Sequence, residues 1–484
     1  MQEKNVDVAV IGAGSAGLSA FRAAREHTQS VVLIEGGPYG TTCARVGCMP
    51  SKLLIAAAEA AHGARDSEAF GIHTDRVRID GPEVMARVRR ERDHFVQGVL
   101  DSVEKIDEAM KLKGYARFED AHTLMVGDHT RVRAERIVLA TGSSPTWPDF
   151  FEGAGDRLVT NEEIFDWEEL PESVAVFGPG IIGLELGQAL SRLGVRIRMF
   201  GVGGSVGAIT DPVIRDYAVK HFNNAFYLDP DAETTSIECD GERVAVTFIE
   251  RPSGQKVTEH FDYLLAATGR TPNIAGLSPE RAGLRLENGV PEFNRHTLQC
   301  LLKDERPGHI FIAGDADEDA PLLHEATDEG RIAGDNAGRY PHIRAGKRRS
   351  MLSIVFSEPQ IAAAGQFWST LESRDAPCAV GEVSFESQGR ARVIRQNHGL
   401  LRVYGEHGSG LFLGAEMLCP RAENIAHLLA WCHQMRLTVE QMLEMPFYHP
   451  VLEEGLRTAL RDLNARLKLG PEMSEQGLEC GPGT

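Results

Sequence analysis

Two segments of the chain carry the same glycine spacing, and each stands between two apolar runs. In the first, residues 6–11 (VDVAVI) precede Gly12-x-Gly14-x-x-Gly17, and the next apolar run, VVLIE, ends at Glu35. This order predicts a strand, a tight turn that opens a helix, and a second strand. The glycines let a pyrophosphate approach the helix N-terminus, and an acid at the end of the second strand can bind ribose hydroxyls. The segment therefore predicts a dinucleotide site.

The pattern repeats in residues 173–200, where Gly178-x-Gly180-x-x-Gly183 stands between SVAVF and VRIRMF. Close packing of a helix on a sheet is the other explanation of such a turn, but both flanking strands are present and favour a second dinucleotide site. Two such sites in one chain suggest that one nucleotide passes electrons to another. The next residue is Gly201, followed by VGGSVG, so neither the acid typical of an NAD site nor an arginine for a 2′-phosphate is present. The choice between NAD and NADP stays open.

Two further apolar runs, RIVLATGSSP (136–145) and HIFIAGDA (309–316), end in glycine and small polar residues. Open α/β sheets bind ligands at such strand ends, so Asp315 is a candidate to hold a sugar or ribityl hydroxyl. The segment that follows, PLLHEATDEGRIAGDNA, predicts a helix whose N-terminal dipole can stabilise negative charge on a cofactor.

The stretch GTTCARVGCMPSK, residues 40–52, places Cys43 and Cys48 five positions apart. A disulfide across so short a loop stabilises little, and no second pair lies at zinc-ligand spacing, so a reversible redox pair remains. Residues five apart on a regular helix point about 140° away from each other. We therefore expect Cys43 in an irregular turn and Cys48 near the start of a helix, where the dipole favours its thiolate. One sulfur is then reachable from outside, and the other faces the first nucleotide.

A base is needed to deprotonate an incoming dithiol, and one histidine has a suitable context. In FYHPVLEEGLRTAL, His449 precedes Pro450 and stands five residues before Glu454. A carboxylate at this distance can fix the tautomer of the imidazole ring. A loop histidine before a proline is also often structural, so the spacing alone leaves both interpretations open.

Composition excludes several classes of protein. The 484 residues include 51 basic and 70 acidic side chains, and the formal charge of −19 argues against a nucleic-acid or anionic-membrane surface. No apolar run approaches the roughly 18 residues of a membrane span, and the N-terminus has no signal-peptide pattern. Apart from the close pair, the cysteines are scattered singly, which fits a reducing cytoplasm and predicts no metal site.

Taken in order, these motifs resemble those of the pyridine-nucleotide disulfide oxidoreductases, and most of all the dihydrolipoyl dehydrogenases. The resemblance runs from VAVIGAGSAG to FYHPVLEEGL and includes Cys-x4-Cys-x-Pro-Ser-Lys, TGRTPN and IFIAGDA. It implies an α/β fold with two Rossmann-like domains, for FAD and for NAD(P), and a C-terminal α+β dimerisation domain. The expected ranges are 1–150 for the FAD domain, completed by 280–345, then 151–279 for the NAD(P) domain, 346–470 for the dimerisation domain and 471–484 for a flexible tail.

The resemblance also implies roles for single residues. Cys43 exchanges with the substrate, Cys48 is the thiolate beside the flavin, and His449 with Glu454 completes the site of the partner in a homodimer. The residues implied for FAD are Gly12, Gly14, Gly17, Glu35, Lys52, Ala116 and Asp315. The residues implied for the nicotinamide nucleotide are Gly178, Gly180, Gly183, Gly269 and Glu185, the last of these paired with Lys52.

The expected reaction passes electrons from a dithiol to NAD(P)⁺, with dihydrolipoyl groups as the leading substrate and a lipoylated carrier protein as a candidate partner. A departure from the family pattern at Thr41 leaves the turn before the cysteine pair open. Departures at Arg45, Tyr448 and Gly201 leave the dithiol and the nucleotide open. The alternatives are a reductase of another disulfide, such as glutathione, and a flavin redox sensor with little turnover. A mercuric reductase would need a pair of cysteines near the C-terminus, where only Cys480 occurs.

Overall fold

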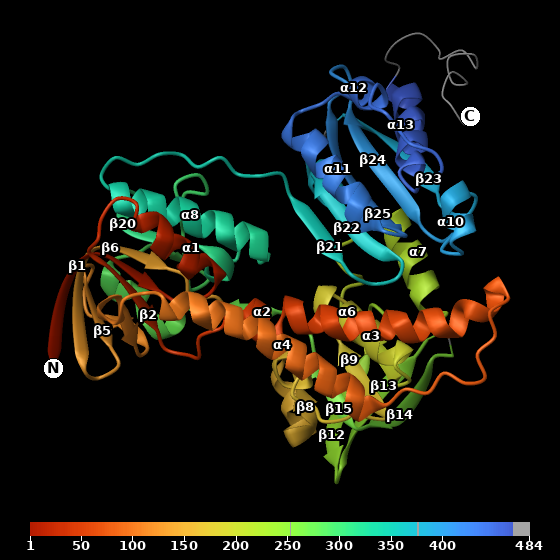
Figure 1. The fold of residues 1–484 in the computed structure, drawn as a ribbon, viewed down its shortest axis with the longest axis horizontal. Coiled ribbons are helices and arrows are strands. Elements are labelled where there is room, and N and C mark those ends of the chain that lie inside the picture. The colour runs from red at the N-terminus through yellow and green to blue at the C-terminus, as the bar shows by residue number, and fades with distance from the viewer. Residues whose placement is uncertain (252, 375–376, 468–484) are drawn as a thin grey trace.

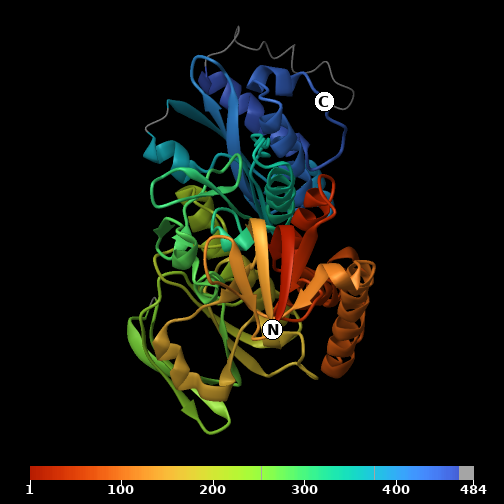
Figure 2. The ribbon, with the colours of Figure 1, turned by 90° about the vertical axis from the view of Figure 1, so that its left-hand side faces the viewer.

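The structure is a computed structural model, and it describes residues 1–251, 253–374 and 377–467. Figure 1 shows two α/β regions that share the N-terminal two thirds of the chain and a blue C-terminal region with a sheet of its own. In Figure 2 the red and orange strands of the first region face the viewer, and the C-terminal region lies at the top. Cys480 and the predicted tail lie outside the described residues.

The first region is built on a sheet that joins segments far apart in the sequence. Strand β1 (Gln2–Ile11) lies between β2 (Val31–Glu35) and β6 (Thr130–Leu139), and β20 (Pro307–Ile312) pairs with the other side of β6, all in parallel. The sheet also contains β3 (Lys111–Lys113), β4 (Ala116–Phe118), β5 (Thr123–Val126) and β19 (Gln299–Leu301). The carboxyl ends of the parallel strands share one edge, so the first glycine turn and the end of β20 meet there.

Helices α1 (Ser15–Ala24) and α8 (Leu323–Arg339) pack against each other through small residues. A Cβ atom at Gly330 would lie 2.1 Å from the carbonyl oxygen of Ala16, so this approach requires glycine. No side chain caps the N-terminus of α8. Its first N–H groups are therefore available to a negatively charged ligand.

The second region repeats the strand, glycine turn, helix and strand of the first. Its sheet is parallel throughout, in the order β11-β10-β9-β15-β8. The bounds are β8 (Leu158–Val159), β9 (Ser173–Phe177), β10 (Arg196–Phe200), β11 (Tyr227–Asp229) and β15 (Tyr263–Ala266). Helix α6 (Ile181–Arg192) follows the turn, and an antiparallel sheet is formed by β12 (Thr234–Asp240), β13 (Arg243–Glu250) and β14 (Gln255–Phe261).

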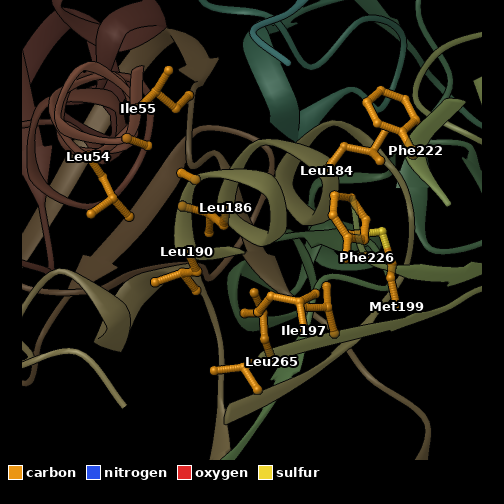
Figure 3. Close-up of a cluster of buried hydrophobic side chains, with 14 of the residues drawn as sticks. Leu54, Ile55, Leu184, Leu186, Leu190, Ile197, Met199, Phe222, Phe226 and Leu265 are labelled. Carbon is orange, nitrogen blue, oxygen red and sulfur yellow. The ribbon is translucent and has the colours of Figure 1, made fainter. Parts of the chain in front are cut away.

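A buried apolar cluster joins the two regions (Figure 3). Leu186 and Leu190 of α6 belong to the same cluster as Leu54 and Ile55 of α3 (Cys48–Asp66). A fully buried side chain of this size contributes roughly 1.5–3 kcal/mol relative to its exposure to water. Helix α3, which begins at the second cysteine of the pair, is thereby held against the second nucleotide unit.

The C-terminal region is an antiparallel sheet in the order β21-β22-β25-β24-β23, covered by helices. Its strands are β21 (Leu352–Val355), β22 (Gln360–Gly365), β23 (Cys378–Ser384), β24 (Leu400–Glu406) and β25 (Phe412–Cys419). Helix α11 (Ala422–Gln434) packs on β22 and β25, and α13 (Glu454–Leu467) packs on β23 and β24. Two Rossmann-like units followed by an α+β region confirm the predicted fold class. The exact domain boundaries stay a prediction.

The described chain contains further helices and strands, among which α4 packs along α3. They are α2 (Thr42–Val46), α4 (Gly81–Glu104), α5 (Asn161–Ile164), α7 (Pro212–Phe222), α9 (Trp368–Ser373), α10 (Gly389–Val393), α12 (Val439–Leu443), β7 (Ser143–Pro145), β16 (Arg270–Pro272), β17 (Leu286–Glu287) and β18 (Val290–Pro291). None of the helices in the described residues combines the length and the apolar character needed to cross a bilayer.

A buried carboxylate fastens the C-terminal sheet to the second region. Glu416 of β25 is only 1% exposed and accepts hydrogen bonds from the backbone N–H groups of Thr210 (2.6 Å), Asp211 (3.0 Å) and Trp368 (2.8 Å). Asp211, the N-cap of α7, is in turn paired with Arg402 of β24 at 2.5 Å. These contacts orient one region relative to the other.

Replacing this carboxylate should lower the stability of the folded protein. We expect Glu416→Ala to lower the free energy of unfolding by about 3 kcal/mol, because buried N–H groups lose their acceptor. Glu416→Gln, which keeps an acceptor oxygen, should cost clearly less. Urea denaturation followed by circular dichroism measures both, and equal stability of wild type and Glu416→Ala would show that the contact does not hold the regions together.

Candidate active site

A cavity of about 1350 Å³ opens where the two α/β regions and the C-terminal region meet. Pockets for a single small ligand usually measure about 300–1,000 Å³, so this cavity has room for more than one ligand. Both glycine turns, the cysteine pair and side chains of α8 and α11 line it. The predicted site residues in its wall are Gly14, Cys43, Cys48, Lys52, Gly180, Glu185, Gly269 and Asp315.

The first glycine turn has the shape that a dinucleotide requires. Gly12 has a φ of +102°, and a Cβ atom there would lie 2.1 Å from the carbonyl oxygen of Ala140, directly after β6. A Cβ at Gly14 would meet nothing within 4 Å, so this residue borders open space at the N-terminus of α1. At Gly17 a Cβ would come within 1.8 Å of the carbonyl oxygen of Gly12, which allows α1 to pack closely.

Glu35 stands at the end of β2, where the predicted ribose contact belongs. Its carboxylate accepts hydrogen bonds from the backbone N–H groups of Ala13 and Gly37, each at 2.7 Å. The N–H of Gly114 donates to the carbonyl oxygen of Glu35 at 3.0 Å, which brings Ala116 at the start of β4 close to this strand end. The adenosine end predicted for FAD is thus assembled from residues about 80 positions apart, although the contact of Ala116 with adenine stays a prediction.

The second turn repeats this geometry. Gly178 has a φ of +100°, a Cβ at Gly180 would meet nothing within 4 Å, and a Cβ at Gly183 would lie 1.9 Å from the carbonyl oxygen of Gly178. Gly269, with a φ of +136°, lies in the wall of the same cavity. The backbone of both turns therefore fits a pyrophosphate.

Asp315 lies just beyond β20, in a wall of the cavity, and accepts a hydrogen bond from Ser143 Oγ at 2.9 Å. Ser143 Oγ in turn accepts one from Arg270 Nε at 2.8 Å. The uncapped start of α8, at Leu322 and Leu323, lines the cavity beside it. The structure thus brings together a carboxylate for hydroxyl groups and a helix terminus for negative charge, as the two strand ends predict.

The cysteines lie on either side of a break between two helices. Cys48 is the first residue of α3, as predicted. The prediction of an irregular turn around Cys43 is wrong, because Cys43 lies in the short helix α2. Gly47, with φ −125° and ψ −119°, interrupts the helical path, and this break allows the two sulfurs to approach each other.

The two thiols are joined by a side-chain hydrogen bond and are electrically unequal. This bond, helped by Lys52, lowers the pKa of Cys48 from its ordinary 9.0 to about 7, against the effect of burial. The same bond and burial raise the pKa of Cys43. Both residues face the cavity, and Cys48 is the more exposed of the two on the polypeptide surface. Cys48 is therefore the thiolate of the pair, and Cys43 is the donor.

Lys52, one turn into α3, links the thiol pair to the second nucleotide unit. Its Nζ lies 2.7 Å from Glu185 Oε2 on α6 and 4.7 Å from the centre of the Phe356 ring. Glu185 is only 4% exposed, and its other oxygen accepts the N–H of Phe356 at 3.0 Å. The predicted pairing of Lys52 with Glu185 is present in the structure.

Thr41 marks the departure from the family pattern in front of the pair. It has a φ of 59°, which is unfavourable for a β-branched side chain. Its Oγ1 accepts a hydrogen bond from Ala44 N at 3.2 Å and so caps α2. The cap offsets part of the backbone strain at the loop that positions Cys43.

His449 and Glu454 form the predicted pair, but away from the cysteines. His449 Nδ1 lies 2.9 Å from Glu454 Oε1, and the other carboxylate oxygen accepts the N–H of Val451 at 3.1 Å. Half of the His449 side chain is exposed, at 51%. Neither His449 nor Glu454 belongs to the cavity wall that holds Cys43 and Cys48.

A buried acidic pair supports the turn that carries Asp315. Glu329 of α8 accepts the N–H of Gly314 at 2.8 Å and binds Arg348 at 2.6 Å. Burial, together with the nearby charge of Glu329, raises the pKa of Asp317 to about 8. Asp317 thus keeps its proton to a higher pH than an ordinary carboxyl group does.

Several residues of the site have no local signal in the sequence. Ser143 and Arg270 lie within RIVLATGSSP and TGRTPN, but only the fold shows that Ser143 binds Asp315 and that Arg270 binds Ser143. His427 and Trp431 reach the cavity wall from α11 in the C-terminal region. Their spacing predicts only an amphipathic helix, so nothing in the segment indicates this role.

The fold and the site together define a redox enzyme with two dinucleotide turns and a thiol pair between them. The chain belongs to the pyridine nucleotide-disulphide oxidoreductase family. Residues 6–330 match the family itself, and residues 351–460 match its dimerisation domain.

Relatives with established names are similar over almost the whole chain. The dihydrolipoyl dehydrogenase of Haloferax volcanii is 29% identical and covers 94% of this chain and 95% of its own. The mercuric reductase of Streptomyces lividans is 30% identical with the same shares. Among solved structures, LpdA of Mycobacterium tuberculosis has a TM-score of 0.78 at 24% identity and covers 94% of this chain and 99% of its own. The HOCl-induced flavoprotein disulfide reductase RclA of Escherichia coli has a TM-score of 0.76 at 22% identity, covering 96% of this chain and 100% of its own. At these identities the solved structures show the fold alone.

The family assignment confirms the predicted class, cofactors and chemistry. The chain is a flavoprotein disulfide oxidoreductase that uses FAD and NAD(P). The observed turns fit both groups, because each has a glycine next to open space at a helix N-terminus. The dimerisation domain is present as well.

The hydrogen bond between the thiols can be tested by titration. In the reduced protein we expect the Cys48 thiolate, followed at 240 nm, to form with a midpoint near pH 7. Cys43→Ala removes the largest cause of the lowered pKa, so the midpoint should move upward, towards the 9.0 of an ordinary thiol. Cys48→Ser supplies the blank. A midpoint that stays near pH 7 in Cys43→Ala would show that the bond does not set this pKa.

The raised pKa of Asp317 predicts a pH-dependent stability. An acid with a raised pKa in the folded state favours folding below its unfolded value of 3.8, and this contribution is lost as the pH rises towards about 8. Asp317→Asn removes the titration. We expect the stability of Asp317→Asn relative to wild type, measured as the free energy of unfolding in urea, to be higher at pH 8.5 than at pH 5. A difference that does not change with pH would contradict the assignment.

Proposed function

We propose that this enzyme oxidises a dithiol with NAD(P)⁺, with Cys43 and Cys48 as the redox pair and dihydrolipoyl groups as the leading substrate. The observation that carries the proposal is the pair itself. A thiolate of lowered pKa and a donor thiol face one cavity that also contains both dinucleotide turns. Such a pair is suited to reversible exchange with a second dithiol.

The proposed sulfur chemistry follows from the unequal pKa values of the two cysteines. A substrate thiolate attacks the oxidised pair at Cys43, which leaves Cys48 as the thiolate, in agreement with its lower pKa. The second substrate thiol then displaces Cys43, so the substrate leaves as a disulfide and the pair is reduced by two electrons. FAD, held at the first glycine turn, would supply the two-electron chemistry that links the reduced pair to the nicotinamide nucleotide at the second turn. Lys52 provides a fixed positive charge close to the Cys48 thiolate.

His449 is the proposed base for the substrate thiols. Glu454 contacts Nδ1 at 2.9 Å and so keeps the proton on that nitrogen, which leaves Nε2 as the acceptor. The side chain is half exposed and lies outside the cavity wall of its own chain. This placement supports a homodimer in which His449 and Glu454 of each protomer complete the site of the other.

The apolar surface of the C-terminal region supports the same assembly. On α11, Leu428, Trp431 and Met435 are 39%, 66% and 70% exposed, and they recur at helical spacing. They belong to the segment that matches the dimerisation domain of the family. A second copy of the chain is the occupant that this surface fits. A reducing cytoplasm, where the pair can cycle, remains part of the proposal.

The names of the relatives support dihydrolipoyl groups as the proposed substrate and raise one rival, mercuric ion. Dihydrolipoyl dehydrogenases and mercuric reductases both match over most of the chain. The His449–Glu454 pair supports thiol chemistry, because a dithiol must be deprotonated and a metal ion need not be. The C-terminal segment has only Cys480, which lies outside the described residues, where a mercuric reductase would need two thiols.

The proposal is tested by following NAD(P)H formation at 340 nm with dihydrolipoamide, with reduced glutathione and Hg²⁺-dependent NAD(P)H oxidation as comparison reactions. Turnover with dihydrolipoamide well above the other two supports it. Flavin that is bound but not reduced by any dithiol would instead favour the redox sensor, and faster turnover with glutathione would favour the alternative disulfide.

Single variants should show what each residue of the site contributes to dithiol oxidation. We expect Cys48→Ser to abolish dithiol oxidation, because no redox pair remains. His449→Gln should retain bound FAD and lose about two to three orders of magnitude in kcat/KM for the dithiol. Glu454→Gln should lose less, since the imidazole stays but its tautomer is no longer enforced. An unchanged rate in His449→Gln would remove this residue from the mechanism.

Mixed dimers distinguish a shared site from a self-contained one. Cys48→Ser and His449→Gln chains, co-expressed with different affinity tags and purified over both, give a heterodimer. If the site is shared, one of its two sites joins an intact cysteine pair to an intact histidine, and about half of the wild-type activity should return. A site formed within one chain predicts an inactive heterodimer.

A further inference from the structure

The two nucleotide units differ at a pair of positions that the fold brings into contact. In the first unit, the N–H of Ala13 donates to Glu35 Oε2 at 2.7 Å. In the second unit, the residue between the first two glycines is Pro179, and the residue after VRIRMF is Gly201. Proline has no N–H and glycine has no side chain, so both partners of this contact are absent.

Position 201 is also closed to any larger side chain. A Cβ atom on Gly201 would lie 2.6 Å from the carbonyl oxygen of Pro230 and 2.7 Å from Cγ of Pro179. The backbone cannot easily move away, because Gly201 N donates to Asp229 O at 2.8 Å and Ala232 N donates to Gly201 O at 2.9 Å. Packing therefore excludes an acid at this strand end.

An acid at this position discriminates between the two nicotinamide nucleotides in two ways. It accepts a hydrogen bond from the ribose 2′-hydroxyl of NAD, and it repels the 2′-phosphate of NADP. Without it, both effects are lost. Selection of NADP would require a cation in its place, and residues 201–210 (GVGGSVGAIT) contain no charged side chain.

The basic side chains of this unit that border the strand ends already have acidic partners. Arg198 lies 2.5 Å from Glu259, and Arg251 lies 3.4 Å from Asp229. Asp231 is the acid next to the loop, with its Oδ1 bonded to Gly203 N at 3.0 Å and its Oδ2 3.7 Å from Arg251. It holds the loop and faces an arginine of opposite charge, so it is a weak substitute for an acid at position 201.

We propose that the second nucleotide site discriminates little between a ribose 2′-hydroxyl and a 2′-phosphate, because Pro179 and Gly201 close the position from which an acid would choose between them. The inference rests on the proposed function only in that the second unit binds a nicotinamide nucleotide. It makes Pro179 and Gly201 specificity-determining residues of this enzyme.

Equilibrium binding tests the proposal directly. Isothermal titration of the FAD-loaded enzyme with NAD⁺ and with NADP⁺ should give dissociation constants within about tenfold of each other. The two values of kcat/KM with dihydrolipoamide should agree as closely. A preference above about a hundredfold for either nucleotide, or no binding of either, overturns the proposal. Similar binding of both without oxidation of any dithiol would support it while removing the proposed function.

Designed variants identify the residues responsible. The double variant Pro179→Ala with Gly201→Glu restores the N–H and removes the proline ring at 2.7 Å, so that only the Pro230 carbonyl oxygen has to shift to admit the acid. In the folded variant the binding ratio should move towards NAD by about tenfold or more. The control is Val202→Glu, which adds the same charge at a side chain that is 88% exposed, and it should leave the ratio within about threefold. Equal shifts in both variants would attribute the effect to general charge and overturn the role of position 201.

The variant Asp231→Asn tests the remaining explanation, in which Asp231 takes the role of the missing acid. If Asp231 acts as the missing acid, the wild type prefers NAD strongly and this variant loses the preference, which overturns the proposal. If the proposal holds, the ratio in Asp231→Asn stays within about threefold of wild type. Should the double variant fail to fold, the wild-type binding ratio still decides the question.

Discussion

The ion pair between Lys52 and Glu185 connects the three regions of the molecule. Lys52 belongs to the helix that starts at Cys48, Glu185 to the helix that follows the second glycine turn, and the free carboxylate oxygen binds the backbone of the C-terminal region at Phe356. A buried ion pair adds little net stability, because desolvation offsets most of its attraction. Its effect is geometric. It fixes the thiol pair at the cavity into which both dinucleotide turns open, and the same lysine biases Cys48 towards its thiolate.

The inequality of the two sulfurs is a property of the fold as a whole. Neighbouring thiols on one flexible loop would titrate alike, whereas here a break at Gly47 places them in donor and acceptor positions. The strained backbone of Thr41 and its cap on α2 contribute to this arrangement, because they set where the helix that contains Cys43 begins. This division is what allows one sulfur to exchange with substrate while the other holds negative charge.

The two nucleotide units show how one backbone motif serves different ligands. Their glycines have nearly the same φ values and the same close contacts, so both cradles for a pyrophosphate are alike. They diverge at the end of the second strand of each unit, where a ribose contact is predicted. Glu35 is held by an amide in the first unit, while a proline ring and a carbonyl oxygen occupy the corresponding space in the second. Specificity for the sugar is thus separable from the affinity for phosphate, because the two depend on different atoms.

The sequence alone determined the class of this protein, because short-range rules decide the local motifs. The glycine spacings and the apolar runs beside them each predict their own local structure, and these structures are present. The pair His449–Glu454 also follows from spacing, since a residue at a helix start reaches back over one loop. The course of the backbone at Cys43 was predicted wrongly, because a five-residue helix depends on the cap at Thr41 and the break at Gly47 rather than on a periodic pattern. Only the tertiary structure decided which distant residues share the site. Ser143 at Asp315, Trp431 in the cavity wall and the closed position at Gly201 arise from contacts between segments far apart in the chain, and no local pattern encodes such contacts.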